Sequence, residues 1–140
     1  APILVFTTDE VYSLINRDEK NIHEHSFVNV PKNWENKKLN DKWDQLFKIK
    51  QEANIAIEAK RSSKEIGSSL EAEVKLSVNE NKFELLKNLD LAEYLITSKA
   101  EKVLIKDEEM KIEVNKAKGN KCPRCWKILE HSCNRCSNLI

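Results

Sequence analysis

The 140-residue sequence predicts an α+β fold, in which a helical N-terminal region precedes a small mixed α/β unit and a C-terminal four-cysteine module. Apolar residues recur at three- and four-residue steps from about residue 38 to 64, which is typical of a helix. Apolar and polar residues then alternate from 70 to 78, which is typical of a strand. All four cysteines lie in the last nineteen residues. We therefore divide the chain into residues 1–66, 67–118 and 119–140.

The N-terminal region opens with an apolar stretch, residues 1–4, that we expect to be buried. The following residues are typical of a helix start. Thr7 is the expected N-cap, Glu10 is its reciprocal partner, and Phe6 is expected to pack onto Val11. Because a short helix with an apolar lead-in cannot bury its apolar face alone, we expect the sequence to be a piece of a longer chain with further helices upstream.

Residues 16–36 are polar and are expected to form an ordered loop, anchored by its large apolar side chains, Phe27, Val28, Val30 and Trp34. The helix predicted over about residues 38–64 has one apolar face with charged residues between its members. We expect Trp43 and Phe47 on that face to belong to the core rather than to a base-stacking surface. Gly67 is expected to end the helical region in a left-handed conformation.

The central part of the chain predicts a small mixed α/β unit. Residues 70–78 predict a strand with one polar face, and residues 80–89 return to helical spacing. Residues 94–96, 103–105 and 110–114 are expected to be short strands, with the charged stretch 106–109 as a hairpin turn between the last two. Gly119 marks the join to the cysteine module.

The cysteines form two Cys-x-x-Cys pairs, Cys122 with Cys125 and Cys133 with Cys136. A two-residue spacer lets both thiolates of a tight turn point at one metal ion, and two such turns supply four ligands for tetrahedral zinc. The interval between the pairs is seven residues, shorter than the roughly fifteen to twenty of zinc ribbons. His131 lies in this interval and is an alternative ligand to Cys133. We predict one structural zinc ion.

Other uses of the cysteines fit less well. Two disulfides would suit a secreted chain, which the lack of any further cysteine does not favour. A thioredoxin-like redox pair would need a βαβ context that the sequence does not show. A catalytic zinc ion would need an open coordination position and a nearby acid or base, and Glu130 is the only acidic residue after Glu113.

Charge is unevenly distributed along the chain, although the net charge is only +1. Residues 115–140 contain six basic side chains and one acidic one, whereas residues 1–114 contain eighteen basic and twenty-two acidic ones. A basic tip on an acidic body indicates an anionic partner at the tip. No apolar run reaches membrane length, so no membrane partner is expected.

No constellation for catalysis emerges from the sequence. The three histidines, His23, His25 and His131, have no nucleophile nearby in sequence. Two glycines, Gly67 and Gly119, cannot build a phosphate-binding loop. We therefore expect this chain to catalyse no reaction by itself.

Longer motifs resemble a known family. The segment KCPRCW (residues 121–126), followed by CNRC (133–136), resembles the C-terminal zinc-binding domain of bacterial isoleucyl-tRNA synthetases. APILVFTTDEVY (1–12) is similar to the closing helix of the anticodon-binding bundle of class I synthetases, and GSSLEA (67–72) and EYLITS (93–98) are similar to the passage that follows it. The resemblance covers essentially the whole chain. Two departures are the shorter zinc loop and Tyr12, where a tryptophan is more usual.

The resemblance implies a fold and a function. Residues 1–66 would be the end of the anticodon-binding helical region, residues 67–118 a small α/β unit and residues 119–140 the zinc module. The parent would be a cytoplasmic, monomeric isoleucine–tRNA ligase that uses ATP, with its catalytic and editing sites in domains upstream of this chain. This chain would engage isoleucine-specific tRNA near the anticodon, with zinc as its own cofactor and ATP needed only by the parent.

The resemblance also implies which residues contact tRNA. Arg124 and Arg135, one within each cysteine pair, would pair with phosphates or stack on bases. Trp126 would stack on an unpaired anticodon base, or alternatively pack against the zinc loop. Lys121 and Lys127 would be phosphate neighbours that add salt-sensitive affinity.

Two alternatives stay open. DNA glycosylases of the formamidopyrimidine type have a similar zinc finger, although their catalytic N-terminal proline and helical DNA-binding region have no counterpart in this sequence. In the other alternative, the zinc module only pins the C-terminus onto the α/β unit and touches no nucleic acid. A preference for RNA over duplex DNA, and alanine substitutions at Arg124 and Trp126, would separate these functions.

Overall fold

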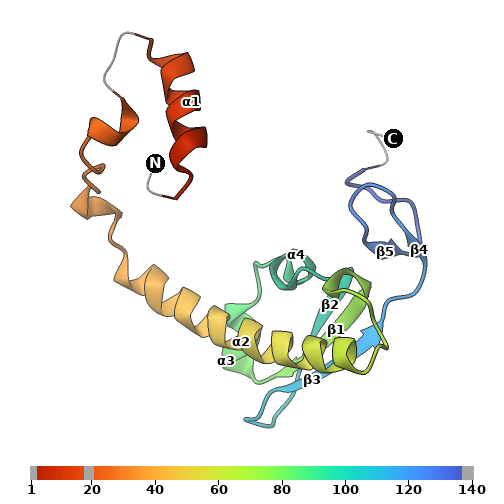
Figure 1. Cartoon of the computed structure of the whole chain (residues 1–140). Helices are drawn as coiled ribbons and strands as arrows, with labels where there is room; N and C mark the ends of the chain where they lie inside the picture. Colours follow the sequence, from red (N-terminus) through yellow and green to blue (C-terminus); the bar gives the residue numbers. More distant parts are fainter. Residues whose placement is uncertain (1–2, 18–20, 137–140) are drawn as a thin grey trace. The chain divides into compact units, whose positions relative to one another are not determined.

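The computed structural model describes residues 3–17 and 21–136 and divides into two compact units, residues 1–36 and 37–140 (Figure 1). The first unit contains helix α1 (Val5–Ile15) and two short 3-10 helices, η1 (Ile22–Glu24) and η2 (Lys32–Trp34). Polar contacts connect α1 to the η1 region, including a 3.1 Å hydrogen bond between the Tyr12 hydroxyl and His25 Nε2. The first two residues of the predicted lead-in, Ala1 and Pro2, lie outside the described residues.

Three expectations for the N-terminal unit are wrong. Helix α1 begins before Thr7, which therefore lies inside the helix, and no side chain caps its N-terminus. The described residues of the apolar lead-in, Ile3 and Leu4, are exposed rather than buried, and Phe6 has 89% of its surface exposed. The expected loop anchors are exposed as well: Phe27, Val28, Val30 and Trp34. The physical reason is that none of the described residues of this small unit, 3–17 and 21–36, is buried, so they form no core against which these side chains could pack.

The second unit is built on a three-stranded sheet in the order β2-β1-β3. The central strand β1 (Ala72–Val78) pairs in parallel with β2 (Lys99–Leu104) and antiparallel with β3 (Lys111–Lys116). Helix α2 (Lys37–Ser62) packs against β3 and against α4 (Leu91–Leu95), and α3 (Glu80–Leu85) contacts β2 (Figure 1). Short 3-10 helix η3 (Ser69–Glu71) leads into β1.

The core of the second unit lies where α2 covers the sheet. Four apolar side chains of β1 have no exposed surface: Ala72, Val74, Leu76 and Val78. Helix α2 contributes one buried stripe: Leu46, Ile49, Ala53 and Ile57. Full burial of each valine, leucine or isoleucine side chain stabilises the folded state by about 1.5–3 kcal/mol. This apolar core stabilises the sheet, to which the cysteine module is joined at residue 119.

The predicted long helix and first strand are confirmed, but the orientation of the helix is not as expected. Trp43 is 37% exposed and Phe47 is 54% exposed, so neither belongs to the core. The buried stripe instead runs through Leu46, Ile49, Ala53 and Ile57. The left-handed conformation expected at Gly67 is found at Lys64, which has φ 62°. Gly67 instead donates its backbone N–H to Glu71 Oε2 at 3.0 Å.

Two further expectations for the α/β unit are wrong. Residues 94 and 95 end helix α4 rather than forming a strand, because Asp90 caps that helix by accepting a hydrogen bond from the backbone N–H of Glu93 at 3.0 Å. The charged stretch 106–109 is not a hairpin turn, since β2 and β3 lie on opposite sides of β1 and do not pair. The connection therefore passes the end of β1. The strands expected near 103–105 and 110–114 are confirmed as β2 and β3.

The predicted division of the chain at residues 66 and 118 stays a prediction. Helix α2 shares one core with the sheet, within the unit formed by residues 37–140. In the part of the chain that the structure describes, no helix combines the length and the apolar character needed to cross a membrane.

Candidate metal centre

The cysteine module is a two-stranded hairpin with two tight turns. Strands β4 (Asn120–Lys121) and β5 (Ile128–Leu129) pair antiparallel. The first turn is closed by the backbone N–H of Trp126, which donates to the Cys122 carbonyl at 3.0 Å, and the second by Cys136, which donates to the Cys133 carbonyl at 2.9 Å. Each turn therefore presents both of its cysteines on the same side.

Gly119 is required where the chain enters this hairpin. Its φ is +120°, a conformation that residues with a side chain rarely adopt. A Cβ at this position would lie 2.1 Å from the backbone oxygen of Leu129. The sequence therefore places glycine where β4 and β5 approach too closely for any side chain.

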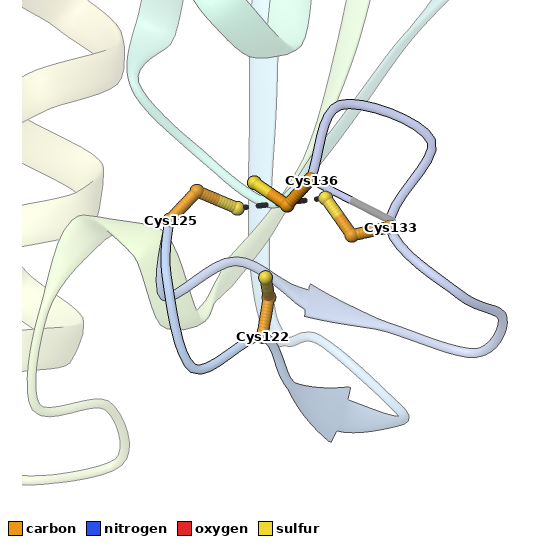
Figure 2. Close-up of side chains that lie close together, drawn as sticks. All are labelled: Cys122, Cys125, Cys133 and Cys136. Atoms are coloured by element: carbon orange, nitrogen blue, oxygen red, sulfur yellow. Dashed lines mark hydrogen bonds between the residues drawn. The ribbon is translucent and has the colours of Figure 1, made fainter. Parts of the chain in front are cut away.

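The four cysteine sulfurs converge at one point. Cys122, Cys125, Cys133 and Cys136 all place their sulfurs within 4.8 Å of one another, and the two turns face each other across the centre (Figure 2). The sulfurs of Cys125 and Cys133 are 3.6 Å apart, too far for a disulfide. Zinc–sulfur bonds of about 2.3 Å in a tetrahedron would place the sulfurs roughly 3.8 Å apart. The cluster therefore fits a four-thiolate metal ion, and His131 is not one of its members.

Backbone hydrogen bonds favour the thiolate form of one of these cysteines. Backbone N–H groups of Cys125 and Arg124 donate to the Cys122 sulfur and lower the pKa of that thiol to about 6. Burial has the opposite effect on Cys136 and raises the pKa of its thiol to about 12. A bound metal ion deprotonates its thiol ligands outright, so all four sulfurs become thiolates when the site is filled.

The structure places Trp126 on the surface beside the cluster. Its backbone is left-handed, with φ 65°, and its side chain is 61% exposed. The ammonium of Lys121 lies 5.4 Å from the centre of the Trp126 ring, within the range of a cation–π contact. The first turn thus holds an exposed aromatic ring next to a positive charge.

The two predicted arginines line a cavity at the cysteine cluster. Arg124 from the first turn and Arg135 from the second line one open cavity of about 430 Å³, together with Cys125 and Cys136. Both arginines are exposed. Two arginines that lie eleven positions apart in the sequence therefore line the same cavity.

Lys127 differs from the other predicted contact residues. Its side chain is only 14% exposed, and its ammonium donates to Glu93 Oε1 of α4 at 2.6 Å. The pKa of the Glu93 carboxyl is lowered mainly by this hydrogen bond, with a smaller effect from Arg135 at 3.6 Å. Sequence reasoning missed Glu93, because nothing in the local pattern around α4 indicates a partner more than thirty residues away.

Comparison with known proteins identifies the family. Residues 1–76 match the family model described as the anticodon-binding domain of tRNA ligase. The chain belongs to this family. Among related proteins, the chain is 48% identical to the isoleucine–tRNA ligase of Pelagibacter ubique over 138 residues, which is 99% of this chain and 15% of that protein.

Other relatives extend the match across the whole chain. The isoleucine–tRNA ligase of Gluconobacter oxydans is 32% identical over 151 residues, and that of Zymomonas mobilis is 34% identical over 146 residues. Each match covers 100% of this chain and only 16% and 15% of the respective relatives. The resemblance to isoleucyl-tRNA synthetases is therefore confirmed, and it includes the cysteine module that lies beyond the family-model match.

Proposed function

We propose that this chain is the tRNA-binding region of an isoleucine–tRNA ligase, whose parent protein attaches isoleucine to its tRNA with ATP. The proposal is supported by the family match over residues 1–76 and by relatives of that name along nearly the whole chain. The parent would be a cytoplasmic monomer, with its catalytic and editing sites in other domains. Residues 1–66 would be the end of the anticodon-binding helical region, and residues 67–118 and 119–140 an α/β unit and a zinc module.

The observation that carries this proposal is that Arg124 and Arg135 both line one open cavity at the cysteine cluster. Guanidinium groups match phosphate oxygens in a bidentate geometry and also stack on bases. Trp126 provides an exposed ring on the same module, and stacking of a base on such a ring contributes about 1–3 kcal/mol. Together these side chains suit an RNA loop, which offers phosphates and unstacked bases close together.

One zinc ion would be held by the four cysteine sulfurs. Its contribution when bound is structural, since it cross-links the two turns and supplies no reaction step. The residues of the chain then make the contacts. Lys121 stands beside Trp126 and is proposed as a phosphate neighbour. Lys127 is also predicted to be a phosphate neighbour. In the structure its ammonium pairs with Glu93, and contact of Lys127 with phosphate stays a prediction.

The structural alternative has one observation in its favour, because the Lys127–Glu93 ion pair pins the module to the α/β unit. Binding measurements separate the two functions. The zinc-loaded chain would be titrated at two salt concentrations with an isoleucine-tRNA anticodon stem-loop, a scrambled-loop RNA and a DNA duplex. We expect the cognate loop to bind most tightly, with ATP unnecessary for binding.

Two substitutions test the named residues. Trp126→Ala should weaken binding of the cognate loop by roughly 5- to 150-fold, because about 1–3 kcal/mol of stacking is lost. Arg124→Ala should weaken binding and reduce the slope of log affinity against log salt by about 1, as expected for one lost phosphate contact. Arg61→Ala is the matched control, since Arg61 pairs with Glu58 of its own helix at 2.7 Å.

The other outcomes are equally informative. Equal, salt-suppressed binding of all three nucleic acids would reduce the module to a basic patch. Preference for duplex DNA would favour the glycosylase alternative. Absence of binding by a chain that has retained its zinc would contradict tRNA binding by this chain and favour the structural alternative.

A further inference from the structure

The zinc module touches the α/β unit at the corner where α4 leads into β2. Lys127 donates to the Glu93 carboxylate at 2.6 Å, and the backbone N–H of Ile128 donates to Ser98 Oγ at 2.6 Å. Arg135, from the second cysteine turn, lies 3.6 Å from the same Glu93 oxygen. Two residues of this corner, Glu93 and Ser98, therefore contact both halves of the module.

The corner itself is firmly held. Ile96 has φ 57°, which is an unusual backbone conformation for a β-branched residue. It is stabilised because the backbone N–H of Ile96 donates to Glu93 and that of Thr97 donates to Ala92, at 3.2 and 2.9 Å. A residue in such a conformation persists only where the surrounding structure determines it strongly. The strained corner places Glu93 and Ser98 on the side that meets the module.

Ser98 connects three segments of the chain. Its hydroxyl donates to the Leu70 carbonyl, just before β1, while accepting from Ile128 of β5. Its backbone N–H donates to the Ala72 carbonyl at 3.1 Å. Ser98 is 6% exposed, so water cannot easily replace these partners. Movement of the module away from the corner would leave the Ile128 N–H without its hydrogen-bond partner.

We propose that Glu93 and Ser98 are positioning residues, which hold the zinc module against the α4–β2 corner in the orientation that presents Arg124 and Trp126 to RNA. The inference rests on the proposed function of the module. It predicts that removing the negative charge of Glu93 lowers the affinity for RNA, which is the opposite of the simple electrostatic effect. A carboxylate beside an RNA-binding surface repels phosphate, so removing its charge should strengthen binding, whereas loss of a positioning contact should weaken it.

Orientation can be measured without RNA. Cobalt(II) bound to the four cysteines in place of zinc would cause pseudocontact shifts at the amides of β1 and β2, and their size reports how firmly the module is oriented. In Glu93→Gln and in Ser98→Ala we expect these shifts to shrink by about half or more, because the module samples several orientations. The cobalt–thiolate absorption should stay unchanged, which shows that the metal site is still formed.

Glu73→Gln is the matched control for charge. Glu73 and Glu93 line the same cavity of about 400 Å³ between the sheet and the module, but Glu73 pairs with Lys99 of the sheet at 2.6 Å. We expect Glu73→Gln to leave the pseudocontact shifts unchanged and the affinity for the anticodon stem-loop equal or higher. Glu93→Gln should lower that affinity roughly tenfold, as expected for a lost charge-assisted hydrogen bond.

Two results would overturn the inference. One is unchanged pseudocontact shifts in both Glu93→Gln and Ser98→Ala. The other is an RNA affinity that rises in Glu93→Gln as it does in Glu73→Gln, since Glu93 would then act through its charge alone. If the unmodified chain bound no RNA, the proposed function would fail, while the cobalt shifts would still decide whether these two residues orient the module.

Discussion

The α/β unit and the zinc module reach a defined structure by different means. Helix α2 and the sheet of the α/β unit bury a continuous set of apolar side chains, and the four inward residues of β1 have no exposed surface. In the module, over the described residues 119–136, the buried residues are Cys122 and Cys136. Apolar burial stabilises the first region, whereas the proposed zinc ion would stabilise the second by cross-linking its two turns.

This difference explains how a region with little apolar core can still hold its side chains in fixed positions. A segment of about twenty residues cannot bury enough apolar surface to fold alone, so small modules of this kind depend on metals or disulfides. In exchange, the module can expose most of its other side chains. Arg124 and Trp126 are exposed and yet held close to the metal ligands.

Removing the metal should have the largest effect, because it should unfold the module and leave the sheet intact. After treatment with a chelator, we expect the amide signals of residues 120–136 to collapse to random-coil positions while those of β1, β2 and β3 persist. The reason is that structural zinc supplies about 10–16 kcal/mol of folding free energy in zinc-finger peptides. Two-dimensional NMR spectra before and after chelation would show it, and re-addition of zinc should restore the signals.

Two substitutions serve as controls for the ligand set. Cys133→Ser should lose zinc, while His131→Ala should keep it, because the Cys133 sulfur belongs to the cluster and His131 does not. Zinc content after gel filtration distinguishes them. A module that stays ordered without metal, or a sheet that melts together with it, would contradict the separation of the two regions.

A substitution in the sheet should produce the next largest effect. Leu76→Ala removes a side chain without exposed surface from the centre of β1, and we expect it to lower the free energy of unfolding by about 2–5 kcal/mol. Urea denaturation followed by far-UV circular dichroism would measure the change. Ile55→Ala is the control, since Ile55 on α2 is 72% exposed and should change the stability by less than about 1 kcal/mol. Similar losses for both variants would mean that the core lies elsewhere.

Substitutions of the two glycines should give the smallest effects and test the geometry of the module separately from that of the α/β unit. Gly119→Ala should destabilise the hairpin of the module by about 1–3 kcal/mol, because the new Cβ would meet the Leu129 backbone at a positive φ. We expect weaker zinc binding in a competition titration with a chelating dye. Gly67→Ala should leave zinc affinity unchanged, since its nearest neighbour is the flexible Glu71 side chain at 3.2 Å. Equal zinc affinities for the two variants would refute the requirement for glycine at 119.

Much of the fold follows from local patterns in the sequence. The three- and four-residue spacing predicted helix α2, the alternation predicted β1, and the paired cysteines predicted a cluster whose sulfurs the structure places within 4.8 Å of one another. These signals are short-range, because a helix repeats within four residues, a strand within two and a metal turn within three. The motifs around the cysteines also led to the family that the comparisons identify.

Other features depended on tertiary contacts. The face of α2 that is buried, with Ile49 inside and Phe47 outside, was decided by the sheet against which it packs. The same holds for the short helix α4, where Asp90 provides a cap that the apolar pattern of residues 94–96 did not reveal. Short apolar runs do not distinguish helix from strand by themselves.

The sequence by itself determined the cysteine cluster, the long helix and the central strand, because each is set by the spacing of neighbouring residues. Only the tertiary structure decided that β2 and β3 flank β1, that Arg124 and Arg135 share one cavity, and that Glu93 meets Lys127. The contacts of Lys127 with Glu93 and of Ile128 with Ser98 join residues thirty or more positions apart. Such pairs leave no periodic signal in the sequence, since they arise only when separately formed elements pack together.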